Sequence, residues 1–237
     1  MRTAKRLFSA FVALAMLFSL AAFPADAASG DYQIAILKVQ KMTAGTTFNA
    51  DTAEAVTDGV DTNDIVVLTV GFKNNSDAAV DVAGFAAKLF YDDTKVSPYT
   101  GTAPFARNAY QVSTELTGDY GWSQAGNGNG NDSGKKFVSA SGGGAEAYTV
   151  KTAADANEDD PNPDEMVLAR FAFQVNKDVD NAVAAFTFDT DTSKTNITDS
   201  DRLTLEVDIE NYKLIIGEGG EDNPDNPDNP DNPDNPD

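Results

Sequence analysis

Acidic side chains are the main candidates for chemistry in this 237-residue chain, because the sequence contains no histidine and no cysteine. Without histidine, serine–histidine and cysteine–histidine nucleophiles are excluded, and the usual zinc sites lose their ligands. Carboxylate, lysine or tyrosine chemistry remains open. The most conspicuous acidic group is Tyr91-Asp92-Asp93, which follows a run of apolar and small residues.

This acidic group is better explained as a turn than as a catalytic pair. Strand alternation places Leu89 and Tyr91 on one face, where they are expected to be core. Aspartates at the end of a strand accept hydrogen bonds from nearby backbone amides, so Asp92 and Asp93 are expected to form an Asx turn. Glycoside hydrolysis would need two carboxylates across a cleft, but 38 acidic residues make chance pairs uninformative. We predict that the protein is not an enzyme.

Calcium is the hard cation that such an acidic surface suits. The segment from Asp189 begins like an EF-hand, with Asp191 and Ser193 at the next ligand positions. It then has Lys194 where a glycine is required and Ser200 where the bidentate glutamate belongs. The segment is therefore not an EF-hand. No metal site or cofactor is predicted, although a loosely bound surface calcium ion is left open.

The first residues are predicted to be a signal peptide, residues 1–27. Arg2, Lys5 and Arg6 precede an apolar run, Leu7–Phe23, and Ala25-Asp26-Ala27 supplies the small residues that a signal peptidase recognises. The protein is therefore expected to be secreted, with no transmembrane segment in the mature chain. Its net charge of −21 argues against nucleic acid as a partner.

Residues 218–237 are predicted to be a disordered linker or tail, because a repeat of Asp, Asn and Pro cannot bury apolar surface. Residues 28–217 form the one predicted domain. Runs with strand periodicity and no sustained helical periodicity indicate an all-β fold, a two-sheet sandwich of the jelly-roll or immunoglobulin-like type. The segments with strand patterns are Tyr32–Lys41, Ile65–Phe72, Lys135–Ser141, Met166–Val175, Ala182–Asp189, Leu203–Val207 and Tyr212–Ile216.

Two finer expectations follow from the same patterns. In the segment from Met166, alternation places Val167, Ala169, Phe171 and Phe173 on the face opposite Arg170 and Gln174. The glycine-rich stretches 126–134 and 141–144 have turn and loop compositions, and 119–124 is expected to be an edge strand or a loop.

Several motifs resemble those of cohesin domains, in the same order along the chain. VAGFAAKLFYDDTKV, residues 82–96, resembles the third strand of that family, which runs from Gly-Phe to Tyr-Asp. IVVLTVGFKNN resembles the strand before it, and SGKKFVSASGGG is similar to the sixth strand with its small-residue exit. MVLARFAFQVNKDVDNAVAAFTFD resembles two strands joined by a charged loop, and ENYKLIIG resembles the closing strand. The resemblance covers most of residues 32–217.

The resemblance implies a sandwich of about nine strands from a secreted bacterial protein that binds a dockerin, a calcium-dependent helical module. In the best-known cohesins the contact face includes the outward side of the third strand, with an aspartate two places after the glycine. Ala86 occupies that position here, with Lys88 and Phe90 beside it and Ser139 at the matching outward position of the sixth strand. These four residues are the predicted partner-binding site, in an extracellular polysaccharide-degrading or cell-surface assembly.

Two other interpretations remain open. A carbohydrate-binding module would stack aromatic rings on polysaccharide, and Tyr120 and Trp122 are the candidates for that role. The competing explanation for Trp122 is that it packs against the edge of the sandwich. The third interpretation is a structural cell-surface domain without a specific ligand.

Overall fold

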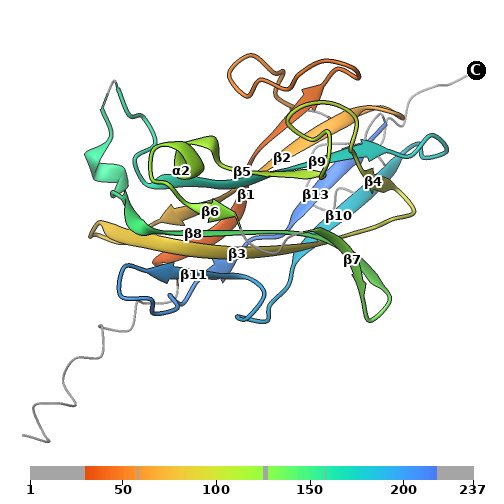
Figure 1. Cartoon of the computed structure of the whole chain (residues 1–237). Helices are drawn as coiled ribbons and strands as arrows, with labels where there is room; N and C mark the ends of the chain where they lie inside the picture. Colours follow the sequence, from red (N-terminus) through yellow and green to blue (C-terminus); the bar gives the residue numbers. More distant parts are fainter. Residues whose placement is uncertain (1–29, 58, 125–127, 158, 218–237) are drawn as a thin grey trace, which may run out of the picture.

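The computed structural model describes residues 30–57, 59–124, 128–157 and 159–217, which form two β-sheets packed face to face (Figure 1). The predicted signal peptide and the predicted tail lie outside the described residues. The first sheet contains β1 (Tyr32–Met42), β2 (Ile65–Asn74), β4 (Val96–Pro98), β5 (Tyr110–Val112), β9 (Glu165–Val175) and β12 (Asp208–Ile209). The second contains β3 (Val80–Tyr91), β6 (Ser123–Gln124), β7 (Gly128–Asp132), β8 (Lys135–Val150), β10 (Ala182–Phe188), β11 (Asn196–Asp199) and β13 (Tyr212–Ile216).

The strand order confirms the predicted all-β sandwich. The first sheet has the order β12-β1-β2-β9-β4, with β5 also paired to β9. The second has the order β13-β10-β3-β8-β6, with β11 paired to β3 and β7 to β8. Helical structure is limited to α2 (Thr114–Gly118) and a 3₁₀ turn at Ala153–Asp155 within the described part of the chain. No helix among the described residues is long and apolar enough to cross a membrane.

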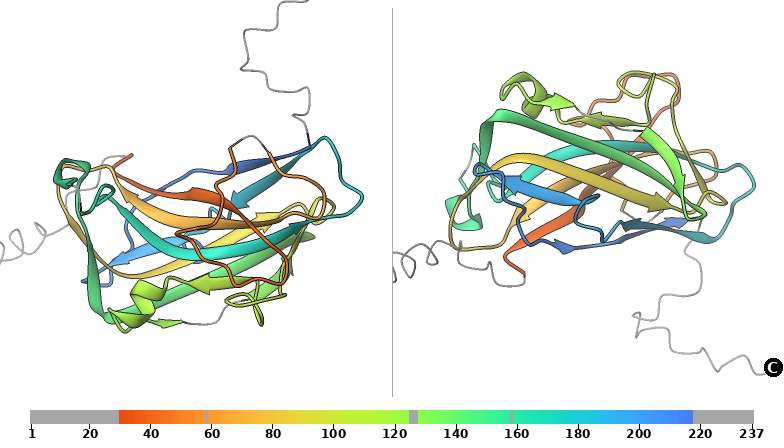
Figure 2. Two further views of the ribbon diagram at one scale, coloured as in Figure 1. Left: turned by 90° about the horizontal axis from the view of Figure 1, so that it is seen from above. Right: turned by 60° about the horizontal axis from the view of Figure 1, so that its bottom comes forward.

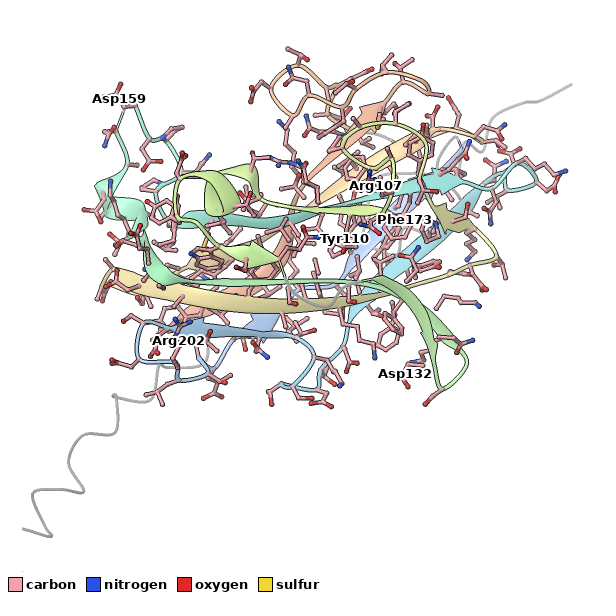
Figure 3. All side chains as sticks on the ribbon, in the orientation of Figure 1. Arg107, Tyr110, Asp132, Asp159, Phe173 and Arg202 are labelled. Atoms are coloured by element: carbon pink, nitrogen blue, oxygen red, sulfur yellow. The ribbon has the colours of Figure 1, made fainter. Side chains whose placement is uncertain are left out.

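Aromatic side chains hold the two sheets together. Phe173 of β9 contacts the ring of Tyr91 on β3 at 5.2 Å between centroids and the ring of Phe186 on β10 at 4.9 Å. Both contacts are edge-on, the arrangement that ring quadrupoles favour. Phe173 belongs to one sheet and both its partners belong to the other, so these contacts fix the spacing between the two sheets. Phe173 is labelled in Figure 3.

The outer face of the first sheet is also covered, which explains the near-continuous apolar run of β2. Met42, Phe48, Ile65, Val67, Phe105 and Ala172 form a second buried cluster there. Phe48 and Phe105 come from the long connections after β1 and β4, and their rings lie 5.9 Å apart. A strand with both faces buried is expected to lose the alternation of polar and apolar residues.

The predicted alternation of β9 is wrong at one position, Val167, because of a β-bulge. Val70 pairs with Ala169, but the next residue of β2, Gly71, pairs with Val167, so Leu168 is extra. Leu168 is fully buried, whereas Val167 is only half-buried. The bulge reverses the alternation that holds from Ala169 onward.

The predicted strand at Leu203–Val207 is also wrong. Leu203 is 48% exposed, and the segment makes only an isolated bridge, between Thr204 and Thr198. The strand that pairs with β3 in this region is β11, which begins at Asn196. An alternating pattern over five residues is short enough to arise in a loop.

The glycine-rich stretches at 126–134 and 141–144 were predicted as loops, and both proved to contain strands. Asn131 pairs with Lys136 in the β7–β8 hairpin, and Gly142 pairs with Phe85 within β8 and β3. Small residues are needed here because large rings lie over the strand. A Cβ atom on Gly144 would lie 2.5 Å from Cδ1 of Trp122.

We therefore expect Gly144→Ala to lower the free energy of unfolding by about 1–3 kcal/mol, the usual cost of overpacking. The measurement is urea denaturation followed by Trp122 fluorescence, which also reports displacement of the ring. Gly128→Ala is the matched control, because nothing lies within 4 Å of a Cβ at Gly128. Equal stability of the two variants would contradict this account of the glycines.

Candidate functional site

The four predicted partner-binding residues lie together on the outward face of the second sheet. Ala86, Lys88 and Phe90 follow one another at every second position of β3, and Lys88 lies directly opposite Ser139 of β8. Phe90 lies opposite Phe137. Figure 2 shows β3 and β8 side by side, with β11 on the other edge of β3.

Two hollows follow one another along β3 on this face, and together they form a trough. The first hollow has a volume of about 450 Å³. Ala86, Lys88 and Ser139 form its floor, and the β7–β8 hairpin and the loop before β11 form its walls. The second, of about 390 Å³, lies over Gly84 and Gly143. Asp132 on the hairpin and Arg202 beside β11 mark the two ends of the trough in Figure 3.

The Lys88 side chain is only 5% exposed, although Ala86, Phe90 and Ser139 on the same face are partly accessible. Its Nζ donates to Oδ2 of Asp132 at 2.5 Å and lies 2.9 Å from Oδ2 of Asp189. The same Nζ lies 4.8 Å from the ring centre of Phe90 and 4.6 Å from that of Phe137. Lys88 is thus a structural cation with its charge satisfied inside the face.

The backbone of Lys88 is engaged as well. Its carbonyl accepts a hydrogen bond from the amide of Asp189, and its amide donates to Oγ1 of Thr195 at 3.4 Å. β10 pairs with β3 from Leu89 to Tyr91, and β11 pairs with it from Val82 to Ala86. Lys88 therefore lies where one partner strand leaves β3 and the next one joins, and it binds both ends of the loop between them.

The ion cluster shifts the pKa values of its members. Burial works to lower the pKa of Lys88, but the hydrogen bonds to Asp132 and Asp189 outweigh it and raise that pKa above 10.5. The hydrogen bond from Lys88, followed by one from Ser133, lowers the pKa of Asp132 below 3.8. Lys88 and Asp132 are therefore both charged across the neutral range.

The remaining predicted residues stay accessible. Ala86, Phe90 and Ser139 are half-buried, and the Ser139 hydroxyl donates a long hydrogen bond of 3.4 Å to the carbonyl of Gly128. Sequence reasoning missed Phe137 and Asp132, which complete the setting of Lys88. The signal for Phe137 was available, since it belongs to the same alternation as Ser139 on β8.

The expected turn at Asp92 is confirmed. Its Oδ1 accepts hydrogen bonds from the amide of Thr94 at 3.0 Å and from the Thr94 hydroxyl at 2.6 Å. The Thr94 hydroxyl, with smaller contributions from the amide and from Lys95, lowers the pKa of Asp92. The carboxylate serves the turn and Lys95, which lies 3.2 Å away.

The acidic loop from Asp189 uses its carboxylates for its own backbone. Oδ1 of Asp189 accepts from the amide of Asp191, and Oδ1 of Asp191 accepts from the amide of Ser193. The other oxygen of Asp189 contacts Lys88. No group of three or more potential metal-ligating side chains occurs within the residues described.

The aromatic pair of the carbohydrate-binding interpretation does not form a sugar platform. Trp122 is 3% exposed, its ring stacks on Phe85 at 6.3 Å, and its Nε1 donates to the carbonyl of Glu146 at 2.8 Å. Tyr120 is half-buried against Tyr148, with ring centres 4.9 Å apart. The competing explanation, a tryptophan packed at the sandwich edge, is confirmed.

No family model matches the chain, and no curated protein matches it. The chain is similar in structure to a type II cohesin domain from the cellulosome of Acetivibrio cellulolyticus, with 19% identity, a TM-score of 0.43, and coverage of 68% of this chain and 91% of that one. It is similar to the sixth cohesin of scaffoldin B from the same organism, solved with a Cel5 dockerin, at 12% identity, TM-score 0.40 and 68% and 94% coverage. A third is the seventh ScaB type I cohesin of Pseudobacteroides cellulosolvens, at 14% identity, TM-score 0.37 and 67% and 88% coverage.

Replacing Lys88 with methionine is expected to lower the free energy of unfolding by about 1–3 kcal/mol, because Asp189 loses its partner where it is mostly buried. Lys38→Met, at an exposed lysine of β1, is the matched control. If both variants melt at the temperature of the unaltered protein, the cluster does not hold the face together.

The pH dependence of that loss follows from the two pKa shifts. The lowered pKa of Asp132 gives stabilisation that is present above 3.8 and lost as the pH falls through the folded-state value. The raised pKa of Lys88 gives stabilisation that is present below 10.5 and lost as the pH rises through the folded-state value. Melting temperatures of the unaltered protein and Lys88→Met should therefore differ most between 3.8 and 10.5 on the pH scale and converge only below and above these values. A difference that is independent of pH would contradict the assignment.

Proposed function

We propose that the protein is a secreted, non-catalytic interaction module that docks a dockerin-type partner on the outer face of its second sheet. One observation carries the proposal: Ala86, Lys88, Phe90 and Ser139, selected from sequence motifs alone, lie on one outward face, and Ala86, Lys88 and Ser139 line one trough there. The order of the cohesin-like motifs supports the same assignment.

The floor of the trough suits the close approach of another protein. Gly84, Ala86, Ser139, Ser141 and Gly143 present small side chains or none, so a partner backbone can approach the sheet closely. Phe90 adds a half-buried ring at one end, where an aromatic surrounded by polar groups is typical of a binding hot spot. The surface is open and shallow, which fits a protein partner better than a small molecule.

The ion cluster gives the face rigidity. Lys88 ties β3 to the hairpin through Asp132 and to the following loop through Asp189, and these elements are the walls of the trough. A binding face whose side chains are already locked loses less conformational entropy on association. Lys88 therefore acts by positioning the face and does not itself contact the partner through a free ammonium group.

Ala86 stands where the best-known cohesins have an aspartate, and this difference bears on specificity. The exchange removes a charged acceptor from the centre of the face and leaves a flat apolar position. We infer that the partner meets Ala86 with an apolar contact. Dockerins that rely on an acidic acceptor at that position are then bound weakly by this chain.

The docking proposal is tested by capture from the secreted proteins of the source organism, with calcium and then with chelator. Dockerin-bearing proteins should be recovered only with calcium, and a recovered dockerin is then purified for calorimetry. Ser139→Arg should weaken its binding at least about tenfold, because a long cationic side chain fills the trough. Ala145→Arg, at an exposed position of β8 outside the trough, should bind like the unaltered protein.

Two results would count against this function. Recovery of no dockerin-bearing protein under either condition would leave a structural domain without a specific ligand as the better account. Equal weakening by both arginine substitutions would place the contact elsewhere on β8. Circular dichroism of both variants separates these results from misfolding.

A further inference from the structure

A second recess lies on the other sheet, away from the docking face. Its volume is about 620 Å³, and it is lined by the connection that follows β1 together with residues 63–65 at the start of β2. In Figure 1 this connection is the orange loop at the top, whereas β7 and β11 lie at the bottom. A ligand there would leave the trough free.

The loop that forms the recess is held in place by hydrogen bonds. The side-chain amide of Gln40, which is fully buried, donates to the carbonyls of Ala50 at 2.9 Å and Ala53 at 2.8 Å. The amide of Phe48 donates to the carbonyl of Ala103, and the Thr102 hydroxyl donates to the carbonyl of Thr46. The recess is therefore formed before any ligand arrives, as is usual for small-molecule sites.

Its base is apolar. Met42, Phe48 and Ile65 line it and are 7%, 9% and 2% exposed, and the Phe48 ring is fixed against Phe105. An apolar base that includes an aromatic ring suits the C–H face of a sugar ring.

Its rim is polar, and much of its hydrogen-bonding capacity is unused. The hydroxyls of Thr43, Thr47 and Thr52 line the recess, and no hydrogen bond occupies them within the described chain. The carboxylate of Glu54 also lines it, and its charge contributes to the raised pKa of Lys41. Hydroxyls donate and accept, and a carboxylate accepts twice, so the rim complements neighbouring hydroxyl groups of a ligand.

The charge of the rim restricts the ligand class. Lys41 lies 3.0 Å from Asp64, and the hydrogen bond to Asp64 raises the pKa of Lys41, so these two charges neutralise each other. Glu54 leaves one negative charge, which disfavours anions. Among the described residues no three His, Cys, Asp or Glu side chains are grouped as a metal ion would need. A neutral, hydroxyl-rich molecule meets both restrictions.

We propose that this recess binds a short neutral oligosaccharide, with its sugar ring over Phe48 and its hydroxyl groups on Glu54, Thr47 and Thr52. The volume falls within the roughly 300–1,000 Å³ typical of small-molecule pockets. The recess is thus a candidate sugar-binding site that does not involve the buried Trp122.

The test is a titration of the ¹⁵N-labelled full chain with cellobiose, xylobiose, mannobiose and maltose, each at millimolar concentrations. At least one sugar should shift the amide resonances of residues 43–54 in a saturable way and leave those of β3 and β8 unchanged. Glu54→Gln should weaken that binding about tenfold or more, because it removes a charged acceptor while keeping the shape of the side chain. Thr47→Val should weaken it by a smaller factor.

Glu146→Gln is the matched control, because Glu146 is exposed on the second sheet, and it should bind like the unaltered protein. Absence of saturable shifts at residues 43–54 with all four sugars overturns the proposal. Shifts that survive Glu54→Gln unchanged also overturn it, since the ligand then lies elsewhere. Neither result affects dockerin binding, which is measured with a different probe on the other sheet.

Discussion

The structure depends on the hydrogen bonding of β3 along both edges. One edge pairs with β8 over nearly its whole length, whereas the other is shared by β10 and β11 in succession. The change of partner leaves a gap that a loop must bridge, and an unpaired backbone there would be costly. Lys88 closes the gap with its amide, its carbonyl and its ammonium group.

This arrangement explains why a lysine is buried on a strand that otherwise carries small or aromatic residues outward. A buried ammonium needs opposite charge close by, and Asp132 and Asp189 supply it from the two elements that border the strand. The rings of Phe90 and Phe137 exclude water and add their negative faces. The cation therefore joins three segments that are far apart in the sequence.

Much of this fold could be predicted from the sequence, because long strands carry strong patterns. The apolar run of β2 and the paired phenylalanines of β10 gave the correct strands, and the alternation of β3 assigned Leu89 to the core and Phe90 to the outside. These patterns depend only on which face each residue occupies, and that is a local property of an extended chain.

The sequence failed where tertiary contacts override local composition. Glycines at 142–144 have a loop composition, yet they lie within β8 because Phe85 and Trp122 need the space above them. One extra residue, Leu168, reversed the face of Val167, and no local pattern marks such a bulge. The burial of Lys88 could not be predicted, because both of its partners, Asp132 and Asp189, lie far along the chain after it, the nearer one 44 residues away.

The two outer faces of the sandwich differ in how far they are covered by loops. The outer face of the first sheet is covered by the connections after β1 and β4, and the recess lies between the connection after β1 and the start of β2. The outer face of β3 and β8 has no such cover, so its side chains must be made compatible with water or with a partner. Small residues along the floor and a neutralised lysine meet that requirement.

Charge then determines what can approach. The chain carries a net charge of −21, and Lys41, Lys73, Lys88, Lys95 and Lys151 are each already paired with a carboxylate. A partner therefore meets an acidic overall field, and electrostatic steering favours a partner that is positively charged or carries bound calcium. Because such steering is screened within about 8 Å at physiological salt, it governs the rate of encounter, whereas the contacts within the trough govern how long the complex lasts.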